Sequence, residues 1–383
     1  MTRFPGVVFG ISGSIGAYKS LDVIRKCRAF GLNIAPVFSA SAHRFVTPWS
    51  VETLAEAPLI QSDMDQGNIT HLMLGETANL MVVCPASANT IAKLARGQAN
   101  DLLSATCLSF NGTVLLFPAM HTQMWENPIT QANVNHLKER GMVIIEPDVG
   151  ALACGDSGAG RLPDPGVIAQ VIYAHAIKNI PLTDKHITIT CGGTSEPIDP
   201  VRRITNSSTG LFGHAIANIA AGFGAKVRLI RTILHPTLST IECLDVQTAK
   251  DMADAVLGAP PCNGLVMAAA VSDFTVTALQ KKQTRGSHRQ LNLTPTTDIL
   301  AAFNKQKPIN CTSIGFCLTD DPNPIAVGKQ KLTTKGCDVM VVNGPESFGK
   351  RHRNAHILTS TSETPVLNWN IESLAMELLI RIK

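Results

Sequence analysis

Short apolar runs alternate with helix-spaced segments from the start of the chain, and a glycine-rich turn marks the first junction. Residues 7–9 are predicted to form a strand, and residues 17–30 a helix with Ile24 and Cys27 facing inward. The turn between them reads Gly10-Ile-Ser-Gly-Ser-Ile-Gly16. Further strands are predicted at 33–38, 80–83, 114–117 and 142–146. This alternation predicts an α/β domain with a parallel sheet.

A second α/β series begins after residues 178–185, which follow the end of a helical pattern near Ala176 and are predicted as a linker. A length of 383 residues is enough for two domains that each bury a core. The sequence therefore predicts two doubly wound, Rossmann-like domains, residues 1–178 and 179–383. Strands of the second are expected at 187–190, 226–230, 265–268, 313–316 and 338–342, with helices at 211–223 and 371–379.

Composition excludes several classes of protein. With 45% hydrophobic and 16% charged residues the chain is globular, and a net charge of +4 gives no reason to expect nucleic acid as a partner. Ten cysteines occur without a CxxC pair, which favours reduced thiols and a cytoplasmic location. No uninterrupted apolar stretch approaches membrane-spanning length, so no membrane association is expected.

The turn at residues 10–16 has the features of a phosphate-binding loop, because it offers backbone amides at a helix N-terminus beside hydroxyl groups. Its spacing differs from GxGxxG and no acidic residue ends the second strand, so a mononucleotide is favoured over NAD. Two later segments, rich in small polar residues, also follow predicted strands, where ligands of open α/β sheets bind. Turns and loops shaped only by sterics are the alternative. The candidate cofactor-binding residues are Gly10, Ser12, Gly13, Ser14, Ser39, Pro85, Ser87, Asn89 and Thr90.

Three further features of the first half carry candidate chemistry. Cys154 is flanked by glycines in Ala153-Cys-Gly-Asp-Ser-Gly-Ala-Gly-Arg161, a backbone too glycine-rich for a buried core thiol. Residues 118–125 read Pro-Ala-Met-His-Thr-Gln-Met-Trp, and His71 precedes a helix-like segment at 72–80. A hydrogen-bonded boundary histidine, a core tryptophan and a solvated Arg161 are the plainer interpretations of these residues.

In the second half, Gly192-Gly-Thr-Ser-Glu-Pro-Ile-Asp-Pro-Val-Arg-Arg203 follows a predicted strand and suits an anion-binding turn, in which Asp199 can orient Arg202. Met267-Ala-Ala-Ala-Val-Ser-Asp273 places small residues at a strand end, where a nucleotide can approach the backbone. Lys331 and Lys335 share one helix face, an arrangement that is more often a solvated surface than a phosphate site.

Together, the motifs of the first half resemble the flavin-dependent cysteine decarboxylases, with a flavodoxin-like flavoprotein domain. The resemblance implies that the three polar segments bind FMN, that His71 is the catalytic histidine and that Cys154 is the acid. It also implies that FMN oxidises the thiol-bearing carbon of the substrate to a thioaldehyde, which allows CO2 to leave, and that Cys154 then protonates the enethiol as the reduced flavin returns hydride. Substrate contacts are assigned to His121, Met124 and Arg161, although the commonest family form has asparagine at the position of His121.

The second half resembles the CTP-dependent ligase usually fused to these decarboxylases. Asn206 matches the residue that contacts the acyl-cytidylate intermediate, and Mg2+ is implied with CTP. In two places the chain departs from the family pattern: Leu211 replaces a lysine, and Cys317-Leu-Thr319 replaces a run with an acidic residue. The CTP-binding residues implied are Met267, Ala268, Ala269, Asp273, Lys281, Thr297, Asp298, Ile299, Phe316, Lys331 and Lys335.

The two resemblances imply a bifunctional enzyme of coenzyme A biosynthesis. It would join 4′-phosphopantothenate to cysteine with CTP and then decarboxylate 4′-phosphopantothenoylcysteine to 4′-phosphopantetheine. A decarboxylase with an impaired ligase half, and a non-catalytic FMN-binding regulatory protein, are the alternatives. The family also implies a homo-oligomer, with trimeric flavin domains and dimeric ligase domains, for which a dodecamer is the implied assembly.

Overall fold

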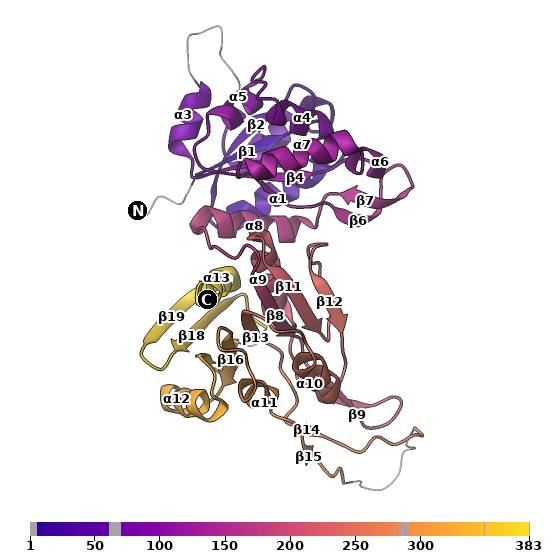
Figure 1. The fold of residues 1–383 in the computed structure, drawn as a ribbon, viewed down its shortest axis with the longest axis vertical. Coiled ribbons are helices and arrows are strands. Elements are labelled where there is room, and N and C mark those ends of the chain that lie inside the picture. Colours follow the sequence, from indigo (N-terminus) through magenta and orange to yellow (C-terminus); the bar gives the residue numbers. More distant parts are fainter. Residues whose placement is uncertain (1–5, 61–69, 283, 285–289, 348, 383) are drawn as a thin grey trace. The chain divides into compact units, whose positions relative to one another are not determined.

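The computed structural model describes residues 6–60, 70–282, 284, 290–347 and 349–382, and the chain divides into two compact units, residues 1–179 and 180–383. In the first unit, five parallel strands form a sheet in the order β2-β1-β3-β4-β5, of which Figure 1 labels β1, β2 and β4. Their hydrophobic runs are buried, as expected for a sheet covered on both faces. The strands are β1 (Gly6–Ile11), β2 (Asn33–Phe38), β3 (Leu80–Ala86), β4 (Thr113–Pro118) and β5 (Val143–Ile144).

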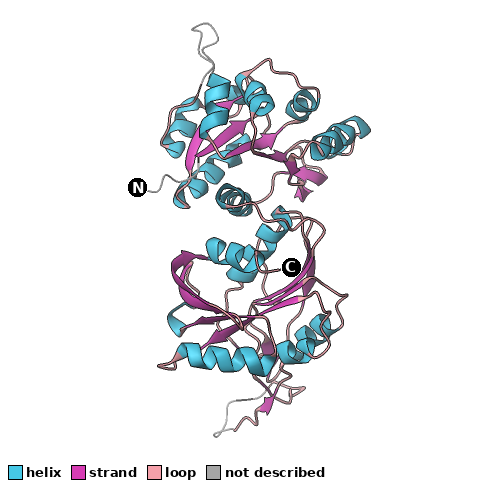
Figure 2. Ribbon diagram, turned by 60° about the vertical axis from the view of Figure 1, so that its left-hand side comes forward, coloured by secondary structure: helices cyan, strands magenta, loops and turns pink. Residues whose placement is uncertain are grey.

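Helices cover both faces of this sheet (Figure 2). One face packs under α3 (Thr70–Thr77), α4 (Ala88–Ala95), α5 (Leu102–Ser109) and α7 (Pro128–Glu139). On the other, α1 (Ala17–Ala29) packs against α2 (Pro48–Ala55) and α8 (Pro165–Ile177). The remaining elements are η1 (Ala42–Arg44), α6 (Thr122–Trp125) and the hairpin β6 (Asp148–Ala151)–β7 (Ser157–Arg161).

The second unit has an eight-stranded sheet in the order β12-β11-β8-β13-β16-β17-β18-β19. Six strands are parallel in the Rossmann order, and β18 and β19 extend them as an antiparallel pair. The strands are β8 (His186–Cys191), β11 (Lys226–Arg231), β12 (Glu242–Asp245), β13 (Gly264–Met267), β16 (Thr312–Leu318), β17 (Val339–Asn343), β18 (His352–Leu358) and β19 (Glu363–Asn370).

Helices α9 (Leu211–Gly222) and α13 (Ile371–Leu379) pack together on one face of this sheet. The other face carries α10 (Ala249–Leu257), α11 (Ile299–Asn304) and α12 (Pro324–Lys335). Short strand pairs and one 3-10 turn complete the unit: β9 (Ser195–Pro197) with β10 (Arg203–Thr205), β14 (Phe274–Thr275) with β15 (Thr294–Pro295), and η3 (Pro345–Ser347).

The predicted α/β class, with two parallel-sheet domains, is confirmed. One local expectation was wrong, and one pair of strands was not predicted. The helix predicted at 72–80 is α3, which includes His71 and ends at Thr77 because Leu80 already begins β3. The antiparallel strands β18 and β19 were not expected. Within the described residues, no helix combines the length and apolar character needed to cross a membrane.

Candidate functional sites

Four loops of the first unit meet at the carboxyl edge of its sheet, where the strand order reverses between β1 and β3. The Ser12 hydroxyl, fully buried, donates to the Pro85 carbonyl at 2.8 Å and accepts from the Ser87 amide at 2.8 Å. Ser14 donates to the Ala119 carbonyl at 3.1 Å. Ser12 therefore ties two of the three predicted cofactor segments together instead of facing solvent.

Two of these loops approach each other so closely at residue 13 that a glycine fits best there. A Cβ at Gly13 would lie 2.3 Å from Ser41 Oγ and 2.5 Å from Ser41 Cβ, so any larger residue would force the Ser41 loop to shift. Helix α1 begins after Gly16 and has no acidic residue in its first turn, which suits an anion, although the Ala17 and Lys19 amides already donate to the Ser14 and Gly16 carbonyls. Of the other predicted residues, Ser39 and Thr90 are buried and Asn89 is exposed, while Ser87 caps α4 by accepting from the Thr90 amide.

Cys154 lies exposed at the tip of the β6–β7 hairpin, beside two titratable groups. Its thiol donates to Oδ2 of Asp156 at 3.7 Å, and Nε2 of His121 lies 2.9 Å from the same oxygen. Because Nδ1 of His121 accepts from the Gln123 amide at 3.2 Å, the ring proton is assigned to Nε2, which donates to Asp156. This hydrogen bond lowers the pKa of Asp156 from its usual value.

Glycines let this hairpin lie directly on the 118–122 segment. The Met120 amide donates to the Gly160 carbonyl at 3.0 Å, and a Cβ at Gly160 would lie 2.1 Å from the Met120 carbonyl oxygen. A Cβ at Gly158 would lie 2.3 Å from Thr122 Oγ1. The glycine-rich sequence around Cys154 is thus what holds the thiol beside His121.

The remaining predicted residues of this unit are more scattered. Trp125 is buried, whereas Met124 is half exposed. Arg161 lies 3.8 Å from Asp148 within the hairpin. His71 is partly exposed in the first turn of α3, where its carbonyl accepts from Ser109. In the part of the chain that the structure describes, no hydrogen bond joins His71 to the Cys154 cluster.

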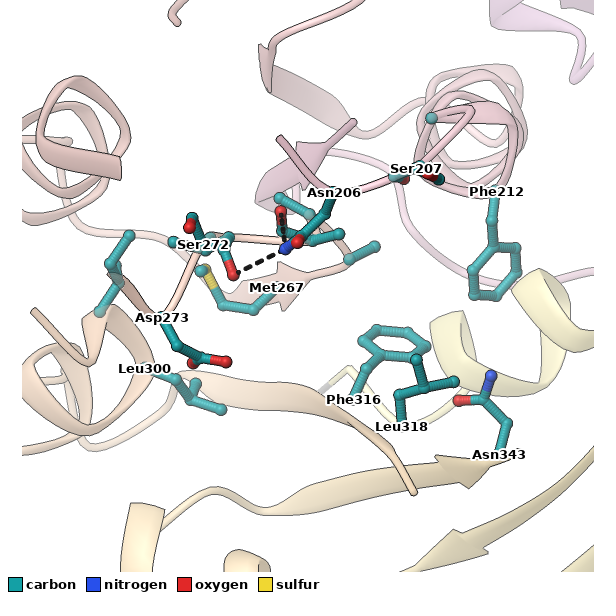
Figure 3. Close-up of a pocket in the computed structure, with 18 of the residues that line it drawn as sticks. Asn206, Ser207, Phe212, Met267, Ser272, Asp273, Leu300, Phe316, Leu318 and Asn343 are labelled. Atoms are coloured by element: carbon teal, nitrogen blue, oxygen red, sulfur yellow. Dashed lines mark hydrogen bonds between the residues drawn. The ribbon is translucent and has the colours of Figure 1, made fainter. Parts of the chain in front are cut away.

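A cavity of about 570 Å³ opens at the carboxyl edge of the second sheet (Figure 3). Asn206 is fixed on one side of it, since its Nδ2 donates to the carbonyls of Ala270 at 3.1 Å and Val271 at 3.3 Å. Phe316, Leu318 and Asn343 lie across from it. Predicted residues that line the cavity are Asn206, Met267, Ala268, Ala269, Asp273, Thr297, Asp298, Ile299, Phe316, Lys331 and Lys335.

Lysine and carboxylate meet at one wall of this cavity. Lys335 Nζ lies 3.0 Å from Asp298 Oδ2. Burial opposes ionisation of Asp298, but the Ala301 amide and the Lys335 ammonium together hold its pKa below the usual value. By contrast, Lys281 is exposed and not among the lining residues, because the neighbouring Leu279 amide donates to the Ile198 carbonyl and draws this segment toward the β9–β10 loop.

Sequence reasoning missed Arg353 of β18, which lines the same cavity. Its guanidinium carbon lies 4.8 Å from the centroid of the Phe212 ring, and Phe212 meets Phe316 edge-on with ring centroids 5.7 Å apart. The run Lys350-Arg-His-Arg353 gave little signal, because a basic run is usually a solvated surface. Leu211 and Leu318, the two departures from the family pattern, also line the cavity.

Comparison with known proteins matches both units. Residues 1–177 match the Flavoprotein family, and residues 182–383 match the DNA/pantothenate metabolism flavoprotein C-terminal domain. The coenzyme A biosynthesis bifunctional protein CoaBC of Mycobacterium tuberculosis is 40% identical over 359 residues, covering 88% of this chain and 85% of that protein. The proteins of the same name from Escherichia coli (35% over 347 residues; 88% and 85%) and Bacillus subtilis (36% over 356 residues; 90% and 86%) are also similar.

Proposed function

The chain belongs to the family of coenzyme A biosynthesis bifunctional proteins, and we propose that residues 1–178 form its FMN-dependent decarboxylase domain and residues 179–383 its CTP-dependent ligase domain. It is a phosphopantothenate–cysteine ligase and phosphopantothenoylcysteine decarboxylase. The ligase joins 4′-phosphopantothenate to cysteine through an acyl cytidylate, and the decarboxylase converts the product to 4′-phosphopantetheine.

The carboxyl edge of the first sheet fits FMN. The glycine-rich turn at the N-terminus of α1, a helix with no acidic residue in its first turn, offers a phosphate site at the switch point of a sheet in the flavodoxin order. FMN, when bound, supplies the electron sink that decarboxylation of a cysteine amide requires. Ser12 acts by fixing the loops, and Ser14, Ser39, Ser87, Asn89 and Thr90 surround the space with hydroxyl and amide groups.

Cys154 is the proton donor of the decarboxylase. The hydrogen bond from its thiol to Asp156 exists only while sulfur carries its proton, which suits an acid rather than a nucleophile. His121 holds Asp156 in place and presents an imidazole where the family has an amide, beside the exposed Met124. His71 serves as base or electrostatic partner, and Arg161 neutralises an anionic group of the substrate.

The 570 Å³ cavity takes CTP. Lys331 and Lys335, one helical turn apart, neutralise phosphate charge as the carboxylate of phosphopantothenate approaches, and Asn206 contacts the acyl group. Asp273 lines the cavity without an ion-pair partner among the described residues, so it offers an oxygen ligand to Mg2+ that enters with CTP.

One coupled assay tests both halves. Purified protein receives 4′-phosphopantothenate, cysteine, CTP and Mg2+, and mass spectrometry follows phosphopantothenoylcysteine and phosphopantetheine. Formation of phosphopantetheine supports both activities in one chain. If it forms only when phosphopantothenoylcysteine is supplied, the ligase half is impaired. A yellow protein that turns over neither substrate would be a flavin-binding regulator.

We also expect a homo-oligomer, with trimeric flavin domains and dimeric ligase domains. Helices α3 and α5 pack together and leave Leu72, Met73 and Leu108 exposed, an apolar surface that suits contact with another subunit. Light scattering at micromolar concentration measures the mass, and a monomer would contradict the assembly. A cytoplasmic location agrees with the ten cysteines, all of which are free thiols.

A further inference from the structure

Arg353 is a partly buried cation on the wall of the ligase cavity. It projects from β18, and its guanidinium packs on the Phe212 ring at 4.8 Å. Phe316 supports the far side of that contact by meeting Phe212 edge-on. Burial lowers the pKa of Arg353, although a guanidinium remains charged at any physiological pH. The side chain is therefore positioned by the Phe212 ring, which Phe316 supports edge-on, and is partly removed from water.

No carboxylate of the described residues compensates this charge. Among the described residues, the Arg353 side chain makes one hydrogen bond, from Nε to the Lys350 carbonyl at 3.4 Å, so both terminal nitrogens remain available as donors. The contrast with Arg351 is direct, since that guanidinium pairs with Glu372 at 2.6 Å. A desolvated, unpaired cation is unfavourable unless an anionic ligand completes it.

The start of α9 identifies the kind of anion that fits. Gly210 caps α9 without a side-chain hydrogen bond, and residues 210–213 line the cavity, so the N-terminal turn of the helix borders the ligand space. Helix α9 is the first helix after β8, which is the first strand of a Rossmann-ordered sheet, the place where such folds bind phosphate. Arg353 rests on Phe212, a residue of this same first turn.

Leu211 leaves this turn without a cation of its own. The resembled ligases have lysine at this position, whereas the chain has an apolar side chain that lines the cavity. Given the proposed CTP site, on which this inference rests, we propose that Arg353 binds the phosphate chain of CTP and replaces, from β18, the charge missing at residue 211. A guanidinium suits this role because it can hold two phosphate oxygens at once.

Isothermal titration of CTP and of cytidine, which lacks phosphates, tests the assignment. Arg353→Gln is expected to weaken CTP binding by about 10- to 100-fold, the range for hydrogen bonds to charged groups, and to leave cytidine binding unchanged. Arg353→Lys should recover part of the loss. The double variant Leu211→Lys/Arg353→Gln should bind CTP more tightly than Arg353→Gln alone. In the wild-type protein, Leu211→Lys should increase CTP affinity much less than it does in the Arg353→Gln variant.

Lys329→Gln is the matched control, since it removes the same charge from α12 at a residue that pairs with Glu363 and does not line the cavity. Equal CTP affinity in wild type and Arg353→Gln would overturn the proposed role of Arg353 but leave the proposed CTP site standing. Equal loss of CTP and cytidine binding would also overturn it, because the residue would then shape the pocket instead of holding phosphate. If wild type fails to bind CTP, the proposed ligase site itself is wrong, and the inference falls with it.

Discussion

His121 and Asp156, 35 residues apart in the chain, are joined by a hydrogen bond of 2.9 Å from imidazole Nε2 to carboxylate Oδ2. The same oxygen accepts the hydrogen bond of the Cys154 thiol at 3.7 Å, so one carboxylate connects the loop of His121 to the thiol that we propose as proton donor. The orientation of the thiol therefore depends on residues that sit on different loops.

Removing this carboxylate is expected to slow decarboxylation. Asp156→Ala frees the thiol and leaves His121 without its acceptor, and we expect kcat to fall by about tenfold, with a smaller change in KM, as for the loss of one hydrogen bond. Steady-state assays with phosphopantothenoylcysteine measure both constants. Glu146→Ala removes an exposed carboxylate of the same unit and should leave them unchanged. A rise in KM with unaltered kcat would instead assign Asp156 to substrate binding.

Cys154→Ser should stop the reaction after oxidation of the substrate, because a hydroxyl is a far weaker acid than a thiol. General-acid catalysis contributes about 10²- to 10⁴-fold, so phosphopantetheine formation should fall within that range while an oxidised product accumulates. Mass spectrometry of the quenched reaction separates the two species. Wild-type rates of product formation would remove Cys154 from its role.

His71→Asn should block decarboxylation without abolishing flavin binding, since the residue lies on α3 and not in the loops that we propose to bind FMN. The measurements are the flavin absorbance of the purified variant and its turnover of phosphopantothenoylcysteine. His136→Asn, on α7, is the control. A colourless His71→Asn protein would point to a structural role, and retained turnover would exclude a catalytic one.

His214 should make the ligase half sensitive to acid. Only 3% of its surface is exposed and Nε2 has no hydrogen-bond partner among the described residues, so burial lowers its pKa from 6.5 to about 4. Between these values the unfolded chain binds the proton and the native chain does not, so stability is lost as pH falls from 6.5 toward 4, by at most about 3 kcal/mol.

The melting temperature of His214→Gln should therefore fall less between pH 7.5 and pH 5 than that of the wild type. Differential scanning fluorimetry at the two pH values measures the difference. His186→Gln, at an exposed residue of β8, should behave as wild type. An unchanged pH dependence in His214→Gln would show that other groups control the acid response.

Much of the fold was predictable because strand and helix signals are local. The strand at 33–38 was predicted with the bounds of β2, and the apolar stripe at 371–379 with those of α13. The predicted ends of elements were wrong where two apolar segments follow each other closely, as at α3 and β3. The strands β18 and β19 escaped notice because polar and charged residues fill most of their positions, His352, Arg353 and Asn354 among them.

The sequence alone determined the α/β class, the order of the motifs and the chemistry that each can supply, since these follow from side-chain type and from periods of two and 3.6 residues. Only the tertiary structure decided which residues meet. Ser12 lies with Ser87, and His121 with Asp156, because parallel strands bring the loops at their carboxyl ends to one edge of a sheet. Arg353 reaches Phe212 across 141 residues because the added strand β18 extends that sheet, a pairing that no local pattern encodes.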